Sequence, residues 1–279
     1  MDPDMRAALV RIAEALERVA PAAHTPQSFD GSRLFRHDPA TGRFVPAPDY
    51  ELFIDLLVGV ERQKHALLQN LERFARGVGC NHVLLWGVRG AGKSSLAKAA
   101  FMTVAEDSPL MRLIEVDRDE VTALPALFET LRPLPERFVI LCDDLSFEAG
   151  AAAAKALKSA LEGGVCGPPR NTLLVATSNR RHLMARDSAE NHGAIATAED
   201  AEEEVSVSDR FGLWIGFPPM DQGAYLRAVR TYADHFGLGA EDLDRRALQW
   251  ALQRGARSGR VAWQFIRELA GELGVSLPA

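Results

Sequence analysis

The stretch from Gly87 to Ser94 has the residue types and the spacing that bind phosphate. It reads Gly-Val-Arg-Gly-Ala-Gly-Lys-Ser and fits the pattern G-x-x-x-x-G-K-[S/T]. Glycines let backbone N–H groups close around phosphate oxygens, and the N-terminus of a following helix adds a partial positive charge. In this pattern the lysine, Lys93, reaches the β- and γ-phosphates, and the hydroxyl of Ser94 ligates Mg²⁺. The alternative is a glycine-rich turn that binds no ligand. The residues expected to bind a triphosphate are Gly87, Val88, Arg89, Gly90, Ala91, Gly92, Lys93, Ser94 and Ser95.

Two carboxylates follow an apolar run farther along the chain. Asp143 and Asp144 come directly after the run Phe138–Cys142. If this run is a parallel strand beside the phosphate loop, its carboxyl end lies at the Mg²⁺ site, and Asp143 holds the metal through a coordinated water. Hydrolysis also needs a group that prepares the attacking water. Asp144 is the first candidate for this role and Glu148 the second, while an exposed turn after a buried strand is the alternative.

A third apolar run ends in polar residues. Leu173 to Ala176 are apolar, and Thr177, Ser178 and Asn179 follow them. Asn179 could orient the attacking water or contact the γ-phosphate, and Thr177 is a further candidate. An asparagine in a turn often only caps backbone groups, so the interpretation depends on the other two motifs.

A parallel sheet would bring these residues together. From Tyr50 onward, short apolar runs alternate with helical patterns, which indicates a parallel sheet covered by helices on both faces. The predicted fold class is therefore α/β, with a five-stranded parallel P-loop sheet between helices. The expected strands are residues 82–86, 111–116, 138–142, 172–176 and 213–217, and the expected helices are 60–76, 94–106, 124–131 and 151–162.

The two ends of the chain carry different patterns. Residues 4–20 form an amphipathic helical pattern that packs on its own domain or docks a partner, and 21–49 is expected to be an irregular arm. After Pro219 three helical segments follow, at 221–236, 241–254 and 258–273. We therefore expect an N-terminal helix and arm over 1–49, a P-loop α/β domain over 50–219, and a small helical lid over 220–279.

Composition and charge narrow the class of protein. A net charge of −6 argues against a surface coated in positive potential for nonspecific nucleic-acid binding, although a local patch stays possible. Cys80, Cys142 and Cys166 lack metal-ligand spacing and fit a reducing cytosol. Because the sequence has neither a signal-peptide pattern nor a run of about 18 apolar residues, we expect a cytoplasmic protein without a membrane partner. The acidic stretch 186–208 is expected to be a solvated loop.

These elements, in this order, resemble the AAA+ ATPases over roughly residues 50–275. More narrowly, the chain resembles a bacterial AAA+-like family classed as a domain of unknown function, in the strings Leu84–Gly87, Cys142–Glu148 and Ser208–Trp214. The resemblance makes residues 87–95 the Walker A loop, Leu141–Asp144 the Walker B strand and Asn179 sensor 1. It also implies that Val58, within Leu57–Glu61, borders the adenine, that Arg210 is an arginine finger, and that Arg260 is sensor 2.

The resemblance implies an ATPase with ATP and Mg²⁺ that works as a homo-oligomeric switch on a protein or nucleic-acid client. Arg210 would act on a neighbouring subunit, or else pair at the surface with Asp209 or Glu203. Arg260 would close the lid over the phosphates, or else lie exposed in a basic run. Most AAA+ members have Asp-Glu where this chain has Asp-Asp, which predicts slow hydrolysis. The pore loop of threading unfoldases is missing between Asp117 and Leu127, which disfavours a translocating motor. A non-hydrolysing nucleotide-dependent scaffold and a P-loop small-molecule kinase are the alternatives.

Overall fold

The computed structural model describes residues 29–48, 53–145, 151–163, 166–179 and 209–277. All the described helices and strands lie within residues 32–279, which form one compact unit. The helix expected at 4–20 and the acidic stretch 186–208 lie outside the described residues. None of the helices in the described part of the chain combines the length and the hydropathy needed to cross a bilayer.

Seven strands form a single sheet in the order β2-β1-β4-β5-β6-β3-β7. Every neighbouring pair is parallel except β1 and β2, which are antiparallel. In parallel strands the carboxyl ends lie at the same edge, so the residues that follow β3, β5 and β6 meet there. The strands are β1 (Leu34–Asp38), β2 (Arg43–Pro46), β3 (Val83–Gly87), β4 (Met111–Val116), β5 (Arg137–Cys142), β6 (Thr172–Ser178) and β7 (Leu213–Phe217).

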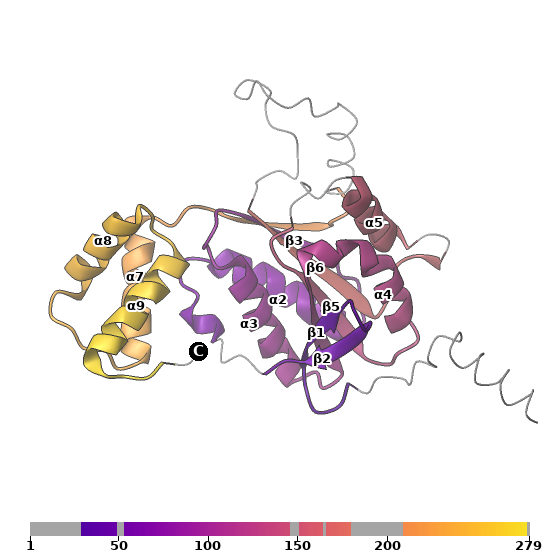
Figure 1. Cartoon of the computed structure of the whole chain (residues 1–279), viewed down its shortest axis with the longest axis horizontal. Helices are drawn as coiled ribbons and strands as arrows, with labels where there is room; N and C mark the ends of the chain where they lie inside the picture. The colour runs from indigo at the N-terminus through magenta and orange to yellow at the C-terminus, as the bar shows by residue number, and fades with distance from the viewer. Residues whose placement is uncertain (1–28, 49–52, 146–150, 164–165, 180–208, 278–279) are drawn as a thin grey trace, which may run out of the picture. The chain divides into compact units, whose positions relative to one another are not determined.

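Helices cover both faces of this sheet, with α2 and α3 on one face and α4 and α5 on the other (Figure 1). Strand residues alternate between the faces, as a pleated backbone requires. Val83 and Leu85 belong to the core cluster shared with α2 and α3, whereas the buried Leu84 between them is outside it. The elements are α2 (Glu61–Ala75), α3 (Lys93–Glu106), α4 (Leu124–Leu131) and α5 (Ala151–Glu162), with short 3-10 turns at η1 (Ile54–Leu56) and η2 (Arg118–Ala123).

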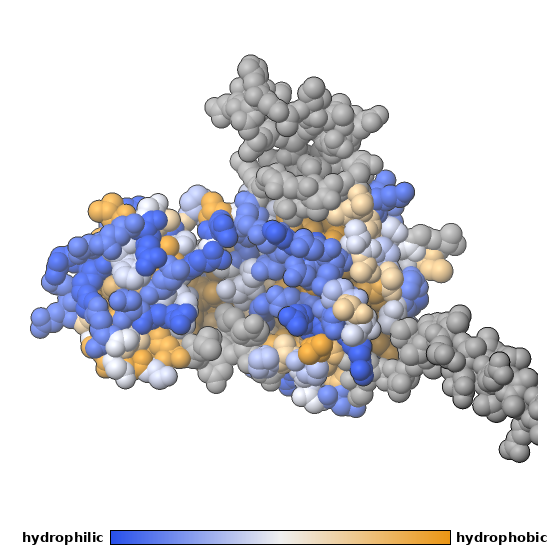
Figure 2. All heavy atoms as spheres, viewed as in Figure 1, coloured by the Kyte–Doolittle hydropathy of each residue, from blue (hydrophilic) through white to orange (hydrophobic). Residues whose placement is uncertain are grey.

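The last three helices, which we call the lid, have a hydrophobic core of their own. They are α7 (Gln222–His235), α8 (Leu243–Arg254) and α9 (Gly259–Leu273). Side-chain caps begin two of them: Asp221 accepts from the Ala224 N–H and Ser258 from the Val261 N–H. Inside the lid, the Tyr225 hydroxyl donates to the Ala247 carbonyl at 3.0 Å. The visible face of these helices is mainly hydrophilic (Figure 2).

Two sequence-based expectations about the sheet are wrong. The sheet has seven strands rather than five, because residues 34–46, expected to be irregular, form β1 and β2 and extend the sheet beyond β4. In addition, β5 is not beside the strand that carries the phosphate loop, because β6 lies between β5 and β3. All five expected strands are confirmed, as β3 to β7, with β6 running two residues farther than expected, through Ser178.

Candidate functional site

The phosphate-binding pattern lies where a strand meets a helix, as expected. Gly87 ends β3, and Lys93 is the first residue of α3. Gly87, Gly90 and Gly92 all have positive φ angles, of 136°, 79° and 91°, which side-chain-bearing residues rarely adopt. A Cβ at Gly87 would also overlap the Phe217 carbonyl of β7. The loop thus requires glycine at these positions to turn tightly into the helix.

Lys93 is buried beside this loop, with 6% of its surface exposed. Its ammonium group donates to the carbonyls of Gly87 and Val88 at 2.9 and 3.0 Å and to Asn179 Oδ1 at 2.9 Å. Burial lowers the pKa of Lys93, and Arg260 acts in the same direction, while Asp144 and Asp143 oppose the shift. The buried Lys93 ammonium is poorly hydrated, and it donates these hydrogen bonds to uncharged oxygens. It is therefore suited to bind an anionic ligand.

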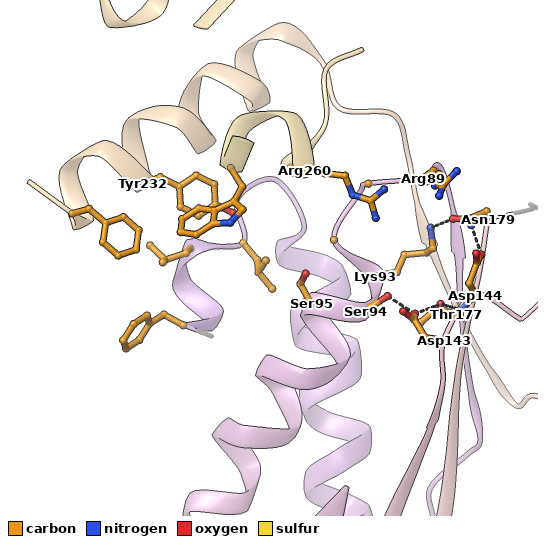
Figure 3. A pocket seen from close by; sticks show the side chains of 18 of the residues that line it. Arg89, Lys93, Ser94, Ser95, Asp143, Asp144, Thr177, Asn179, Tyr232 and Arg260 are labelled. Atoms are coloured by element: carbon orange, nitrogen blue, oxygen red, sulfur yellow. Dashed lines mark hydrogen bonds between the residues drawn. The ribbon is translucent and has the colours of Figure 1, made fainter. Parts of the chain in front are cut away.

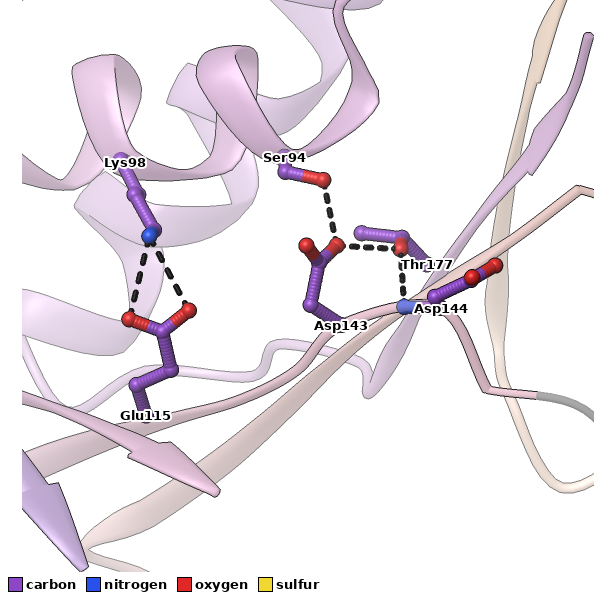
Figure 4. A network of polar contacts seen from close by, with 6 residues as sticks. All are labelled: Ser94, Lys98, Glu115, Asp143, Asp144 and Thr177. Carbon is purple, nitrogen blue, oxygen red and sulfur yellow. Dashed lines mark hydrogen bonds and ion pairs between the residues drawn. The ribbon is translucent and has the colours of Figure 1, made fainter. Parts of the chain in front are cut away.

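Asp143 and Ser94 are in direct contact, although they come from different elements. The Ser94 hydroxyl on α3 donates to Asp143 Oδ1, and the Thr177 hydroxyl donates to the same oxygen at 2.7 Å (Figure 4). Beside this group, Lys98 pairs with Glu115 at 3.0 Å. The hydroxyl and carboxylate expected to hold Mg²⁺ therefore meet at the carboxyl edge of the sheet.

Asp144 has an unusual backbone conformation. Its φ angle is 54°, and Asp242 is the other non-glycine residue with positive φ among those that the structure describes. Aspartate tolerates this region better than most residues, and the Asp144 N–H is held by the Thr177 hydroxyl at 2.9 Å. The Asn179 amide donates to the Asp144 carboxylate, while its Oδ1 accepts from Lys93 (Figure 3). Asn179 thus links the lysine of the loop to the carboxylate after β5.

These side chains line one cavity of about 790 Å³ (Figure 3). The phosphate loop, the aspartates, Thr177 and Asn179 form one end, and the lid and η1 contribute the other. The lining residues are Pro48, Phe53, Leu56, Leu57, Arg89, Gly90, Gly92, Lys93, Ser94, Ser95, Asp143, Asp144, Thr177, Asn179, Tyr232, Phe236, Gly259, Arg260 and Trp263.

The lid contacts the phosphate loop directly through the start of α9. The Arg260 N–H donates to the Gly90 carbonyl at 3.3 Å, and a Cβ at Gly90 would come within 3.0 Å of the Ser258 hydroxyl. The side chains of Arg260 and Arg89 both lie at the loop (Figure 3). With Lys93, three cations therefore surround this end of the cavity.

Four aromatic side chains at the other end were missed by the sequence reasoning. Phe53, Tyr232, Phe236 and Trp263 line the cavity, and the Trp263 ring lies 5.4 Å from that of Tyr232 and 5.7 Å from that of Phe236. No motif could reveal them, because they come from three separate segments. An aromatic residue in an amphipathic helix also usually signals core packing. The signal that existed was the spacing of Tyr232 and Phe236, which places them on one face of a helix.

Some expected site residues do not line this cavity. Val58 packs against the lid core rather than lining the cavity, and Leu57 takes the cavity position instead. Arg210 is not among the lining residues either. Its guanidinium donates to Glu162 at the end of α5, with Nε at 2.7 Å. The alternative partner Glu203 and the candidate base Glu148 lie outside the described residues.

Comparison with protein families identifies the chain. Residues 31–273 match the family described as "Protein of unknown function (DUF815)", and the chain belongs to this family. The narrower resemblance to a domain of unknown function is thereby confirmed. A comparison with curated proteins found no significant match.

Comparison with solved structures shows the fold. The Aeropyrum pernix Orc1 protein, solved in complex with DNA, matches with a TM-score of 0.57 and 18% identity over 81% of this chain. The chain spans 61% of the Orc1 chain, which is less than two thirds of it. The Thermotoga maritima RuvB Holliday junction branch migration motor matches at 18% identity and a TM-score of 0.47, covering 81% of this chain and 85% of that one. The FIGL-1 AAA domain in complex with ADP matches at 16% identity and a TM-score of 0.48, covering 80% of this chain and 86% of that one. The Orc1 match shows that this chain shares the α/β fold of that protein, with a mostly parallel sheet between helices.

Proposed function

We propose that this chain is an AAA+-type protein that binds ATP with Mg²⁺ and hydrolyses it slowly. The observation that carries the proposal is the contact between Ser94 and Asp143 at the carboxyl edge of the sheet. It joins the helix that follows the phosphate loop to the carboxylate that follows β5. The two motifs are far apart in the sequence, and a site for a metal-bound triphosphate needs both in one place.

The residues present fit both ATP and Mg²⁺. The three glycines leave room for phosphate oxygens against backbone N–H groups, and Lys93 supplies a buried positive charge. Mg²⁺ prefers oxygen ligands and is commonly held by one or two protein groups together with substrate phosphates, which the Ser94 and Asp143 oxygens match. When bound, Mg²⁺ would offset the negative charge of the phosphates and orient them. Among the described residues no cluster of three histidine, cysteine or acidic side chains offers a competing metal site.

Hydrolysis would use the chain's own groups at this end of the cavity. Asp144 would accept a proton from the attacking water, with Glu148 as the second candidate. Asn179 would give up its bond to Lys93 as that ammonium turns to the phosphates, and it would then contact the γ-phosphate. Arg260 would stabilise the negative charge that develops there.

The aromatic end of the cavity would hold the adenine. Trp263, Tyr232 and Phe236 offer ring faces and edges at which a purine can stack, which contributes about 1–3 kcal/mol per base. The arrangement supports a single nucleotide that extends from these rings to the phosphate loop.

Arg210 is proposed to act on the site of a neighbouring subunit. Within one subunit it pairs with Glu162, and it does not line the cavity of its own chain. An arginine supplied across an interface typically accelerates hydrolysis by about 10³–10⁵-fold. We therefore propose a homo-oligomeric switch in the cytoplasm, acting on a protein or nucleic-acid client.

A variant at Arg210 tests this role. Arg210→Ala is expected to bind ATP within about twofold of the wild type. It should lose the part of phosphate release that rises with protein concentration, because only assembled subunits would benefit from the arginine. Phosphate release and light scattering, each with and without ATP and Mg²⁺, measure both quantities. Wild-type turnover in the variant would rule out a trans role.

A non-hydrolysing, nucleotide-dependent scaffold is the second candidate. It is favoured by the hydrogen bond from Asn179 to Asp144, which occupies the carboxylate needed as a base. Tight ATP binding without phosphate release at any protein concentration would select it over the ATPase.

A further inference from the structure

Thr177 makes three hydrogen bonds to the segment that follows β5. Its hydroxyl donates to Asp143 Oδ1 at 2.7 Å and accepts from the Asp144 N–H at 2.9 Å. Its carbonyl accepts from the Leu145 N–H at 2.7 Å. A hydroxyl has one proton to donate and lone pairs to accept with, so both side-chain bonds form at once.

This position is fixed by the sheet. β6 lies between β3 and β5, and Leu85 of β3 pairs with Thr177 while Cys142 of β5 pairs with Ala176. Thr177 is therefore beside the residue that follows β5, and it is 1% exposed. A buried hydroxyl whose bonds all go to the neighbouring segment has few other orientations available to it.

The bonds leave the Asp143 carboxylate with a defined orientation. Ser94 and Thr177 both donate to Oδ1, and within the described residues neither hydroxyl uses Oδ2 (Figure 4). Ser94 is itself the expected metal ligand and must turn its oxygen toward the ion when the ion binds. Thr177 can keep its bond throughout, because it approaches from a different element.

We propose that Thr177 is the positioning residue of the metal site: its hydroxyl orients the Asp143 carboxylate for Mg²⁺ and holds the Asp143–Asp144 peptide in place. This inference rests on the proposed ATP and Mg²⁺ site. It differs from the role that the sequence suggests for Thr177, which is to contact the attacking water or the γ-phosphate. A group that orients a metal ligand without touching the ion typically affects metal affinity or activity by about 10–100-fold.

Mg²⁺ titration of the full chain saturated with ATP tests the proposal. Thr177→Val keeps the shape of the side chain and removes the hydroxyl. It should raise the Mg²⁺ concentration at half-saturation by about tenfold or more, while ATP binding in the presence of EDTA stays as in the wild type. Thr177→Ser keeps the hydroxyl and should restore the wild-type Mg²⁺ dependence.

The same strand offers a matched control. Thr172 begins β6, is 5% exposed, and donates to the Pro169 carbonyl at 3.1 Å, at the end of the strand away from the site. Thr172→Val should leave the Mg²⁺ dependence unchanged. Thr177→Ala is the substitute if Thr177→Val does not fold, because it leaves room for a water to bond the Asp144 N–H. It must raise the Mg²⁺ concentration at half-saturation as Thr177→Val does.

The outcomes separate the two proposals. Failure of the wild-type chain to bind ATP overturns the proposed function and this inference together. ATP binding by the wild type that tightens with Mg²⁺, with the same half-saturation in the Thr177→Val or Thr177→Ala variant, overturns the role of Thr177 alone. Weaker ATP binding by these variants in EDTA also overturns it, because the hydroxyl would then support the whole cavity rather than the metal ligand.

Discussion

One end of the cavity is polar and cross-linked by hydrogen bonds, whereas its other end is lined by aromatic rings. The polar end consists of the 87–95 loop, the two aspartates, Thr177 and Asn179, and we call it the phosphate end after the ligand proposed for it. Lys93, Asp143 and Asn179 lie at the carboxyl edge of one sheet, and each is held by at least one partner at the site. Tyr232 and Trp263 belong to the lid, and Phe53, which is 48% exposed, precedes η1. The first end has a geometry set by strand register, while the second depends on side-chain packing between separate segments. We infer that the first end sets the chemistry and the second the affinity for the base.

Removal of the Lys93 ammonium should have the largest effect. Lys93→Ala is expected to weaken binding of ATP and of inorganic tripolyphosphate by at least about 100-fold, or about 3 kcal/mol, because both ligands depend on the phosphate end. Lys158→Ala, at an exposed position of α5, is the matched control and should bind as the wild type does. Calorimetric titration gives the affinities. Retained tripolyphosphate binding by Lys93→Ala would contradict the assignment of this end to phosphate.

Acid should weaken the sheet that supports the phosphate end. His82 precedes β3, and its Nδ1 accepts from the Leu174 N–H at 3.0 Å. Burial lowers the pKa of His82 from 6.5 to about 4. Between these pH values the unfolded chain binds more protons than the folded chain. The free energy of unfolding is therefore not reduced by His82 above about pH 6.5, and it decreases as the pH falls toward 4. We expect the free energy of unfolding to fall by about 2 kcal/mol between pH 7 and 4.5 through this residue.

Urea unfolding at the two pH values measures this effect. His82→Asn keeps an acceptor for the Leu174 N–H but does not titrate, so its pH dependence should be smaller than that of the wild type by the stated amount. An equal pH dependence in both proteins would show that His82 is not the titrating group.

Changes at the aromatic end should have smaller and more selective effects. Trp263→Leu is expected to weaken ATP binding by about tenfold, or about 1.4 kcal/mol, through loss of base stacking. Tripolyphosphate binding should not change, because that ligand has no base. Phe53→Ala should act in the same direction, and Trp214→Ala, at a half-exposed position of β7, is the control. If Trp263→Leu weakened tripolyphosphate binding as much as ATP binding, the two ends would not be separable as we describe them.

The same contrast explains what could be predicted from the sequence. The phosphate end could be predicted because its residues follow continuous apolar strands at fixed offsets, and parallel strands align those offsets at one edge. The strand order could not be predicted, because the pairing of strands that are distant in the sequence leaves no local pattern. This is why the position of β6 between β3 and β5, and with it the contacts of Thr177, became evident only from the structure.

Two short strands and the aromatic residues of the lid were the other features that the sequence did not reveal. β1 and β2 contain charged residues within four or five positions, so neither is a continuous apolar run like β3 or β7, and β1 depends on pairing with the distant β4. The aromatic residues of the lid resemble core positions in sequence, and Trp263 and Tyr232 do pack against the lid core as well as lining the cavity. Val58, chosen by resemblance, is one residue away from the lining residue Leu57.

Calorimetric titration of ATP into the wild-type chain, with Mg²⁺ and with EDTA, tests the central claim most directly. The account predicts a saturable heat at one site per chain in both conditions, with a lower dissociation constant when Mg²⁺ is present. A folded chain that gives no heat with ATP in either condition would contradict it.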